Sequence, residues 1–193
     1  MAARRTAPAP NGAQRRENAP APARALLVVD MLRGFLEPGA ALYCGEAARA
    51  ILPYVARRIR TYARRGEPVL FVCDRHAPDD PEFRLYPPHC VAGTPEAEIA
   101  PELPVPEGAV VLPKRTIDAF YRTGLESRLR RLGVREVEVV GVCTNICVLM
   151  AVAGLTVRGY TAVVPRRGVA TFDPAAHEAA LEQMRSVFGA QVR

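Results

Sequence analysis

The stretch EVEVVGVCTNICVLM, residues 136–150, joins an apolar segment to a short turn and the start of a helix. The segment 136–142 is rich in valine and is predicted to be a strand of a parallel sheet. Residues 145–158 are predicted to form the helix that follows. A strand that leads through a tight turn into a helix is typical of α/β proteins. Cys143 and Cys147 lie at this turn.

The same alternation continues on both sides of this stretch. Further strands are predicted at 25–30, 68–74, 109–114 and 160–165, with a last edge strand at 190–193. Helices are predicted at 45–65, where Pro53 should mark a start or a kink, at 125–133, and at 173–189 with Asp173 as the N-cap. This alternation predicts a three-layer α/β/α fold with a central, mainly parallel sheet of Rossmann-like topology.

The composition indicates one folded domain. The chain has 193 residues, enough to bury a single core, and 49% apolar with 24% charged residues is a globular composition. Residues 1–24 are rich in Ala, Pro and Arg, so we expect a disordered leader there and a folded domain over residues 25–193. No run of 18 apolar residues suggests a membrane span.

The net charge and the cysteine content indicate which binding partners and which cellular compartment to expect. The net charge is +6, but arginines of the leader and of one polar helix face account for much of it, so we expect no nucleic-acid partner. The five cysteines are irregularly spaced, and no secretory signal is visible. We therefore expect free thiols in a reducing, cytoplasmic setting.

Reactive side chains follow four of the predicted strands. Asp30, Asp74 and Lys114 end the first three, and Cys143 and Cys147 follow the fourth. Because parallel strands end at one edge of the sheet, these groups should meet there. A cysteine at a helix N-terminus near a cation is a candidate nucleophile, with a carboxylate as its proton acceptor and backbone N–H groups as oxyanion donors. Alternatively, each of these residues alone has an ordinary structural role, and the two cysteines could be metal ligands, a disulfide or core residues.

The loop 73–90 carries a candidate metal site made of Asp74, His76, Glu82 and His89. Two imidazoles and two carboxylates suit zinc, iron or manganese better than calcium or magnesium. The spacing alone leaves open an ordinary charged loop.

Other candidates are weaker. Asp79 and Asp80 are alternative ligands, although the proline after them favours a turn. His177 has no evident partner among the alanines of its helix. The remaining cysteines are interpreted as small apolar core residues: Cys44, Cys73 and Cys90.

Four segments together resemble the isochorismatase-like cysteine hydrolases, and within them the nicotinamidases. The resemblance covers about residues 25–193 and is carried by LLVVDMLRGF (26–35), DRHAPDDPEFRLYPPHCVAGT (74–94), LPKRTIDAF (112–120) and GVCTNICV (141–148). It implies an isochorismatase-like fold and a metal-dependent amidase that converts nicotinamide to nicotinate and ammonia through a cysteine thioester, a step of NAD salvage.

The resemblance also implies roles for individual residues. Asp30, Lys114 and Cys147 match the catalytic positions, and the backbone N–H groups of Cys143 and Cys147 match the oxyanion hole. The family usually has a cis peptide before the first of these two cysteines. The resemblance implies one divalent metal ion, zinc first with iron or manganese as alternatives, bound by Asp74, His76, Glu82 and His89. It also implies that Phe35 and Tyr86 make aromatic contacts with the substrate ring.

The implied partner is a small-molecule amide, in a cytoplasmic homo-oligomer that binds neither nucleic acid nor membrane. Three residues depart from the nicotinamidase pattern: Ile117, Asn145 and Met150. They leave open two alternatives, a hydrolase of another small amide or an inactive homologue that binds a ligand.

Overall fold

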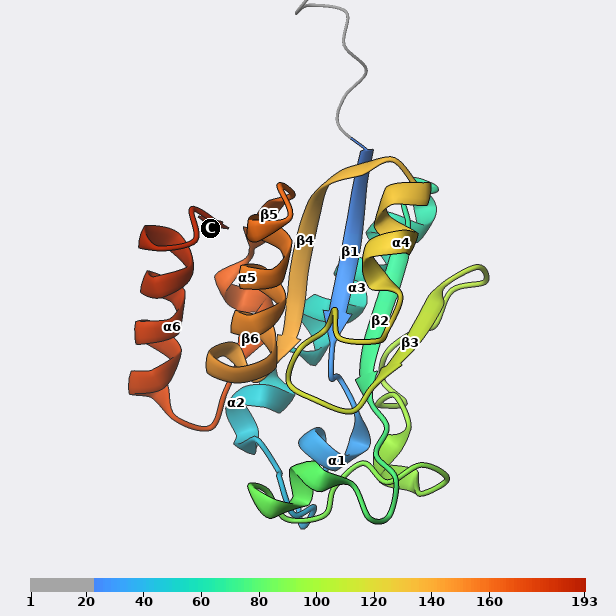
Figure 1. Cartoon of the computed structure of the whole chain (residues 1–193), viewed down its shortest axis with the longest axis vertical. Coiled ribbons are helices and arrows are strands. Elements are labelled where there is room, and N and C mark those ends of the chain that lie inside the picture. Colours follow the sequence, from blue (N-terminus) through green and yellow to red (C-terminus); the bar gives the residue numbers. More distant parts are fainter. Residues whose placement is uncertain (1–22) are drawn as a thin grey trace, which may run out of the picture.

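The structure, a computed structural model, describes residues 23–193. The predicted leader at 1–24 therefore lies almost wholly outside the described residues. In the part described, seven strands form one sheet in the order β3-β2-β1-β4-β5-β7, with β6 beside the end of β4 (Figure 1). Every pairing is parallel. The strands are β1 (Ala23–Val29), β2 (Val69–Asp74), β3 (Val110–Lys114), β4 (Val134–Val142), β5 (Thr161–Val164), β6 (Val169–Ala170) and β7 (Gln191–Val192).

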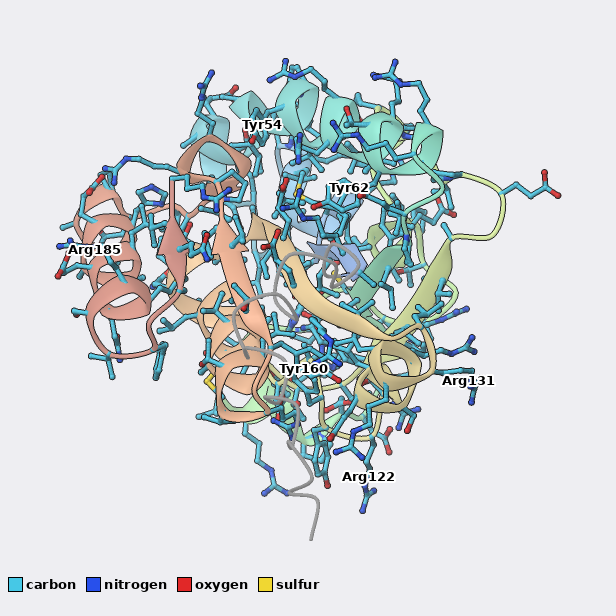
Figure 2. The ribbon with its side chains drawn as sticks, turned by 90° about the horizontal axis from the view of Figure 1, so that it is seen from above. Tyr54, Tyr62, Arg122, Arg131, Tyr160 and Arg185 are labelled. Atoms are coloured by element: carbon cyan, nitrogen blue, oxygen red, sulfur yellow. The ribbon has the colours of Figure 1, made fainter. Side chains whose placement is uncertain are left out.

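Helices cover both faces of this sheet, which confirms the predicted three-layer α/β/α fold. Helices α4, α5 and α6 pack on one face, and α1, α2 and α3 pack on the other. Figure 2 shows Tyr54 and Tyr62 of α3 on the opposite side of the sheet from Arg131 and Tyr160. The helices are α1 (Arg33–Leu36), α2 (Gly45–Ala50), α3 (Leu52–Arg64), α4 (Leu125–Arg131), α5 (Leu149–Val157) and α6 (Pro174–Ser186). None of those within residues 23–193 is long and apolar enough to cross a membrane.

The central strand β1 shows why the buried strands are continuously apolar. Leu27 and Val29 point into the core beneath α4, α5 and α6, whereas Leu26 and Val28 point into the core beneath α1, α2 and α3. All four side chains are fully buried. Burial of each contributes about 1.5–3 kcal/mol, so β1 is held from both sides.

Three local features differ from the sequence predictions. The helix expected at 45–65 is two helices that meet at Ile51, because Pro53 lies in the first turn of α3 and cannot donate a backbone hydrogen bond to the preceding turn. The helix expected at 145–158 begins with a π-helical turn, Thr144–Val148. Two short elements, α1 and β6, were not predicted.

Candidate active site

The carboxyl ends of β1 to β4 gather four reactive residues at one edge of the sheet. Asp30 follows β1, Asp74 ends β2, Lys114 ends β3 and Cys143 follows β4. Asp74 and Lys114 are partners in the β2–β3 register. Asp30 has a φ of 49°, in the left-handed region that is sparsely populated except by glycine, asparagine and aspartate. In Figure 1 these strand ends lie at the lower end of the sheet.

Lys114 is the centre of the cluster. Its ammonium nitrogen lies 2.8 Å from Asp30 Oδ2, 2.5 Å from Asp74 Oδ1 and 3.5 Å from Cys147 Sγ. The three charged side chains are buried. Burial alone would lower the pKa of Lys114, but Asp30, Cys147 and Asp74 raise it well above its usual value. The lysine is therefore a permanent cation in contact with both carboxylates.

The two carboxyl groups have opposite pKa shifts. Burial, assisted by the Asp74 carboxylate, raises the pKa of Asp30 to about 6 against the opposing effect of Lys114. Burial also disfavours ionisation of Asp74, but Lys114 and the imidazoles of His76 and His89 hold its pKa below the usual range. Asp74 is thus a fixed anion, whereas Asp30 can take up a proton near neutral pH.

Cys147 lies in the π-helical turn and is buried beside this cluster. Its sulfur and a carboxylate oxygen from each of Asp30 and Asp74 lie within 4.8 Å of one another. Burial raises the pKa of Cys147 well above its usual value, although Lys114 lowers it in part. Burial and the Asp30 and Asp74 carboxylates therefore outweigh the effect of Lys114 on the pKa of this thiol. The thiol needs a proton acceptor, and Asp30 is adjacent to it.

The turn that carries Cys147 begins with an unusual backbone. The Val142–Cys143 peptide is cis, as the resemblance implied. Gly141, just before it, has a φ of 128°, and a Cβ there would lie 2.0 Å from the Val29 carbonyl oxygen. A glycine is therefore required where β4 approaches β1.

The metal-binding candidates fall into two groups that share His76: one adds Asp74 and His89, and the other adds Asp80 and Glu82. Asp74, His76 and His89 each offer a ligand atom within 4.8 Å of the others. The His76 Nε2–Asp74 Oδ1 distance is 3.5 Å, and the His89 Nε2–Asp74 Oδ2 distance is 3.7 Å. Glu82 lies on the other side of His76, with its Oε2 3.9 Å from Nδ1. The structure therefore brings three of the four predicted ligands into one group and places Glu82 at its border.

Buried polar atoms without partners indicate that this site suits a cation. Both ring nitrogens of His76 and Oε2 of Glu82 are buried and make no hydrogen bond. Burial raises the pKa of Glu82, and the Asp74 carboxylate adds to the effect. A divalent cation would satisfy such atoms, whose burial otherwise costs free energy. The donor set thus fits a divalent metal ion.

Asp80 belongs to the second candidate group and also caps the segment that carries Glu82. Its side chain accepts a hydrogen bond from the Glu82 backbone N–H at 3.1 Å and caps the 3-10 helix Pro81–Arg84. The other carboxylate oxygen lies 3.3 Å from His76 Nδ1. Asp80 therefore orients both the histidine and the segment that carries Glu82. The Asp-Pro-Glu sequence is the signal for this cap.

A cavity of about 220 Å³ opens onto these groups. Phe35 and Tyr86 line it, with ring centroids 5.7 and 6.3 Å from that of His89. An exposed aromatic side chain, Phe172, was not predicted but also lines the cavity. The other lining residues include Asp30, Leu42, Tyr43, Cys44, Glu82, Ile117, Cys143, Ile146 and Cys147. The cavity is small and largely apolar, with the reactive groups on its wall.

Comparison with known proteins identifies the family. The isochorismatase domain model matches residues 24–193. The chain belongs to the isochorismatase family. It is 33% identical to the nicotinamidase/pyrazinamidase of Mycobacterium tuberculosis over 84% of this chain and 95% of that protein.

Solved isochorismatase-like structures share the fold. The pyrazinamidase of Pyrococcus horikoshii in complex with zinc is 34% identical with a TM-score of 0.83, over 89% of this chain and 99% of that one. The N-carbamoylsarcosine amidase of Thermoplasma acidophilum is 33% identical with a TM-score of 0.80, over 88% and 95% of the two chains. This isochorismatase-family protein is therefore an amidohydrolase by relationship.

One further contact in this isochorismatase-family site was not predicted. Thr144 Oγ1 lies 2.9 Å from His177 Nδ1, so α6 is tied to the turn that carries Cys147. Thr144 is fully buried, and burial lowers the pKa of His177. The histidine that had no evident partner in its own helix therefore contacts a residue of the turn that carries Cys147. Sequence alone gave no signal for this long-range pair.

Proposed function

We propose that this protein is a metal-dependent amidase that hydrolyses nicotinamide to nicotinate and ammonia, a step of NAD salvage. The observation that carries the proposal is the arrangement around one cavity: Lys114 contacts Asp30 and Cys147, and Asp74 joins this cluster to His76 and His89. The relationship to a nicotinamidase/pyrazinamidase supports the same substrate class. We expect a cytoplasmic homo-oligomer.

The chemistry begins with Cys147 and Asp30. Asp30 accepts the thiol proton as the sulfur attacks the amide carbonyl carbon, and a carbon–sulfur bond forms. The backbone N–H groups of Cys143 and Cys147 stabilise the oxyanion. Asp30 then gives the proton to the departing nitrogen, and ammonia leaves a thioester. Water, deprotonated by Asp30, attacks the thioester, nicotinate leaves, and the proton returns to the sulfur.

Lys114 stabilises the negative charges that arise during this proton transfer. Its ammonium group contacts both carboxylates and the sulfur, so it stabilises negative charge wherever the charge resides in the cycle. Because Asp74 remains ionised, the mobile proton belongs to Asp30.

The metal ligands and the aromatic residues position the substrate. One divalent ion, with zinc as the first candidate, would be held by Asp74, His76, Glu82 and His89. A bound ion supplies a Lewis-acid position for a pyridine nitrogen. Phe35 and Tyr86 on the cavity wall supply apolar contact to a planar ring.

Ammonia release tests the proposal directly. Protein loaded separately with zinc, iron or manganese is incubated with nicotinamide, and ammonia and nicotinate are measured together. Equimolar release of both by wild type, and none by Cys147→Ala, is expected. Absence of release with all three metals would refute nicotinamide hydrolysis.

A second candidate is hydrolysis of another small amide. Ile117, an apolar residue on the cavity wall, and the relationship to an N-carbamoylsarcosine amidase favour it. The same assay with pyrazinamide, an N-carbamoyl amino acid and an aliphatic amide separates the two. The larger kcat/KM identifies the substrate class.

A further inference from the structure

Two cysteines outside the proposed proton-transfer cluster are in direct contact. The Cys44 and Cys143 sulfur atoms lie 3.1 Å apart, although the residues are 99 positions apart in the chain. Cys44 directly precedes α2, and Cys143 follows β4. No other cysteine pair makes such a contact within residues 23–193. The sequence suggested only a packing role for Cys44, and packing alone does not require contact with a second cysteine.

Both residues line the cavity that Cys147 also lines. Cys44 is 1% exposed and Cys143 8% exposed, and both line the cavity. Because the two side chains are buried, the cavity is the route by which a small reagent would reach them. Cys73 and Cys90 are also buried and free, but they do not line it.

The backbone holds the pair in place on both sides. The Cys44 N–H donates to the Phe35 carbonyl oxygen at 2.9 Å. The Cys143 carbonyl oxygen accepts from the Ile146 and Val148 N–H groups at 3.0 and 3.2 Å. A disulfide bond of about 2.05 Å would need the two sulfur atoms to approach by roughly 1 Å.

We propose that Cys44 and Cys143 form an oxidation site, in which a small hydroperoxide entering the substrate cavity converts the two thiols to a disulfide. One thiol sulfur attacks the peroxide oxygen, the O–O bond breaks, and a sulfenic acid and one water or alcohol result. The second thiol sulfur then attacks the sulfenic sulfur, and the S–S bond forms as water leaves. Two thiols are oxidised by two electrons, and one peroxide is reduced by two electrons.

The environment of Cys143 determines the speed of this reaction. The contact with Cys44, together with burial, raises the pKa of the Cys143 thiol far above its usual value. The Cys143 thiol is therefore protonated at neutral pH. Oxidation should be slow there and should accelerate as the pH rises, because the thiolate is the attacking species.

The test uses the full-length Cys147→Ala protein, so that the proposed nucleophile cannot react. The protein is treated with hydrogen peroxide, unfolded and alkylated, and its peptides are analysed without reduction. A Cys44–Cys143 linked peptide, two hydrogens lighter than the sum of its parts, is expected, with Cys73 and Cys90 alkylated as matched controls. A rise in Tm that dithiothreitol reverses should accompany the link.

Other products would overturn the proposal. These are Cys44 and Cys143 both still alkylated, separate sulfinic acids on each, or a link of either one to Cys73 or Cys90. Introducing Cys44→Ala into the same protein should abolish the link and the reversible Tm rise. Because the first measurement needs no change at either cysteine, misfolding of this second variant would not obscure the result.

A protection experiment tests the route of entry and rests on the proposed function. Binding of nicotinamide to metal-loaded Cys147→Ala is measured by calorimetry, and link formation is timed with and without the amide. Binding with at least tenfold slower linking supports entry through the cavity. Binding without protection contradicts that route. Absence of binding counts against the proposed substrate, while the linked peptide still establishes the oxidation site.

Discussion

Lys114 is the residue on which the active-site charge balance depends. Its ammonium group is the cation within 3 Å of both Asp30 and Asp74, and all three side chains are buried. Such a group stabilises the folded chain by neutralising buried anions. In the proposed mechanism it would also keep the proton exchange confined to Asp30. Both effects can be measured separately.

Replacement of Lys114 should destabilise the protein strongly. Lys114→Met leaves two buried carboxylates without their cation, so the free energy of unfolding should fall by about 3–5 kcal/mol. Denaturant unfolding monitored by circular dichroism measures the loss. The double variant Lys114→Met with Asp30→Asn removes one of the two unpaired charges and should recover part of it. Equal stability of Lys114→Met and wild type would show that the cation is not needed for folding.

Cys143 and Cys147 should respond differently to substitution. Cys147→Ala removes the proposed nucleophile and should abolish ammonia release. Cys143→Ala keeps the backbone N–H proposed for the oxyanion hole, so kcat/KM should fall by no more than about tenfold, or ~1.4 kcal/mol. Steady-state assays of both proteins decide the matter. An equal loss in the two variants would contradict this division of roles.

At the scale of single residues, the sequence predicts which side chains follow the strands. It does not predict contacts that depend on how loops fold. Asp30, Lys114 and Cys147 come together because parallel strands end at one edge. The pairing of Cys44 with Cys143, and that of Thr144 with His177, depends on how distant segments pack. No local pattern encodes such pairs, so they could not be predicted.

Among the elements, the end of β4 is the most constrained. Gly141 has a backbone conformation that side-chain-bearing residues rarely adopt, and the Val29 carbonyl occupies the space of a Cβ. Gly141 therefore fixes how closely the turn that carries Cys147 approaches the centre of the sheet.

Gly141→Ala should separate β4 from β1. The expected result is a loss of several kcal/mol, or failure to accumulate folded protein, because backbone atoms must move to admit the methyl group. Gly159→Ala is the matched control, since Gly159 has a φ of 82° and nothing within 4 Å of its Cβ position. The control should lose only about 1–2 kcal/mol. Thermal unfolding of both variants gives the comparison, and similar losses would contradict the steric argument.

The long elements were predictable, and the short ones were not. The main strands are rich in apolar, mostly β-branched residues, and α6 begins at the Asp173 cap that the sequence indicated. In contrast, α1 and β6 are too short to show a periodicity, and β6 exists because it pairs with Gly141 and Val142 of β4. The π-helical turn also lacks a sequence signature distinct from that of an α-helix.

For the whole molecule, metal binding should be coupled to folding. The predicted ligands are drawn from β2 and the loop after it, and they converge only in the folded chain. A ligand that binds the folded form alone stabilises it by about 2.7 kcal/mol at one hundred times its Kd.

Zinc should therefore raise the Tm of metal-free protein in a concentration-dependent manner. His89→Ala removes one imidazole of the site and should reduce both the bound metal and the Tm shift. His177→Ala, a histidine outside the site, is the control and should retain full metal stoichiometry. Metal analysis after dialysis, together with thermal scans, measures both effects. An unchanged metal content in His89→Ala would exclude this ligand.

The strand order also determines when the protein can become active during its synthesis. β1 ends at Val29, but its neighbour β4 begins only at Val134, so one edge of the central strand has no partner until late in translation. The nascent chain already contains Asp30, the metal loop and Lys114, yet it lacks Cys147 and the strand that positions it. A ribosome that stalls before β4 thus releases an apolar, unpaired sheet edge and no catalyst, and such a fragment is a target for chaperones rather than a partial enzyme.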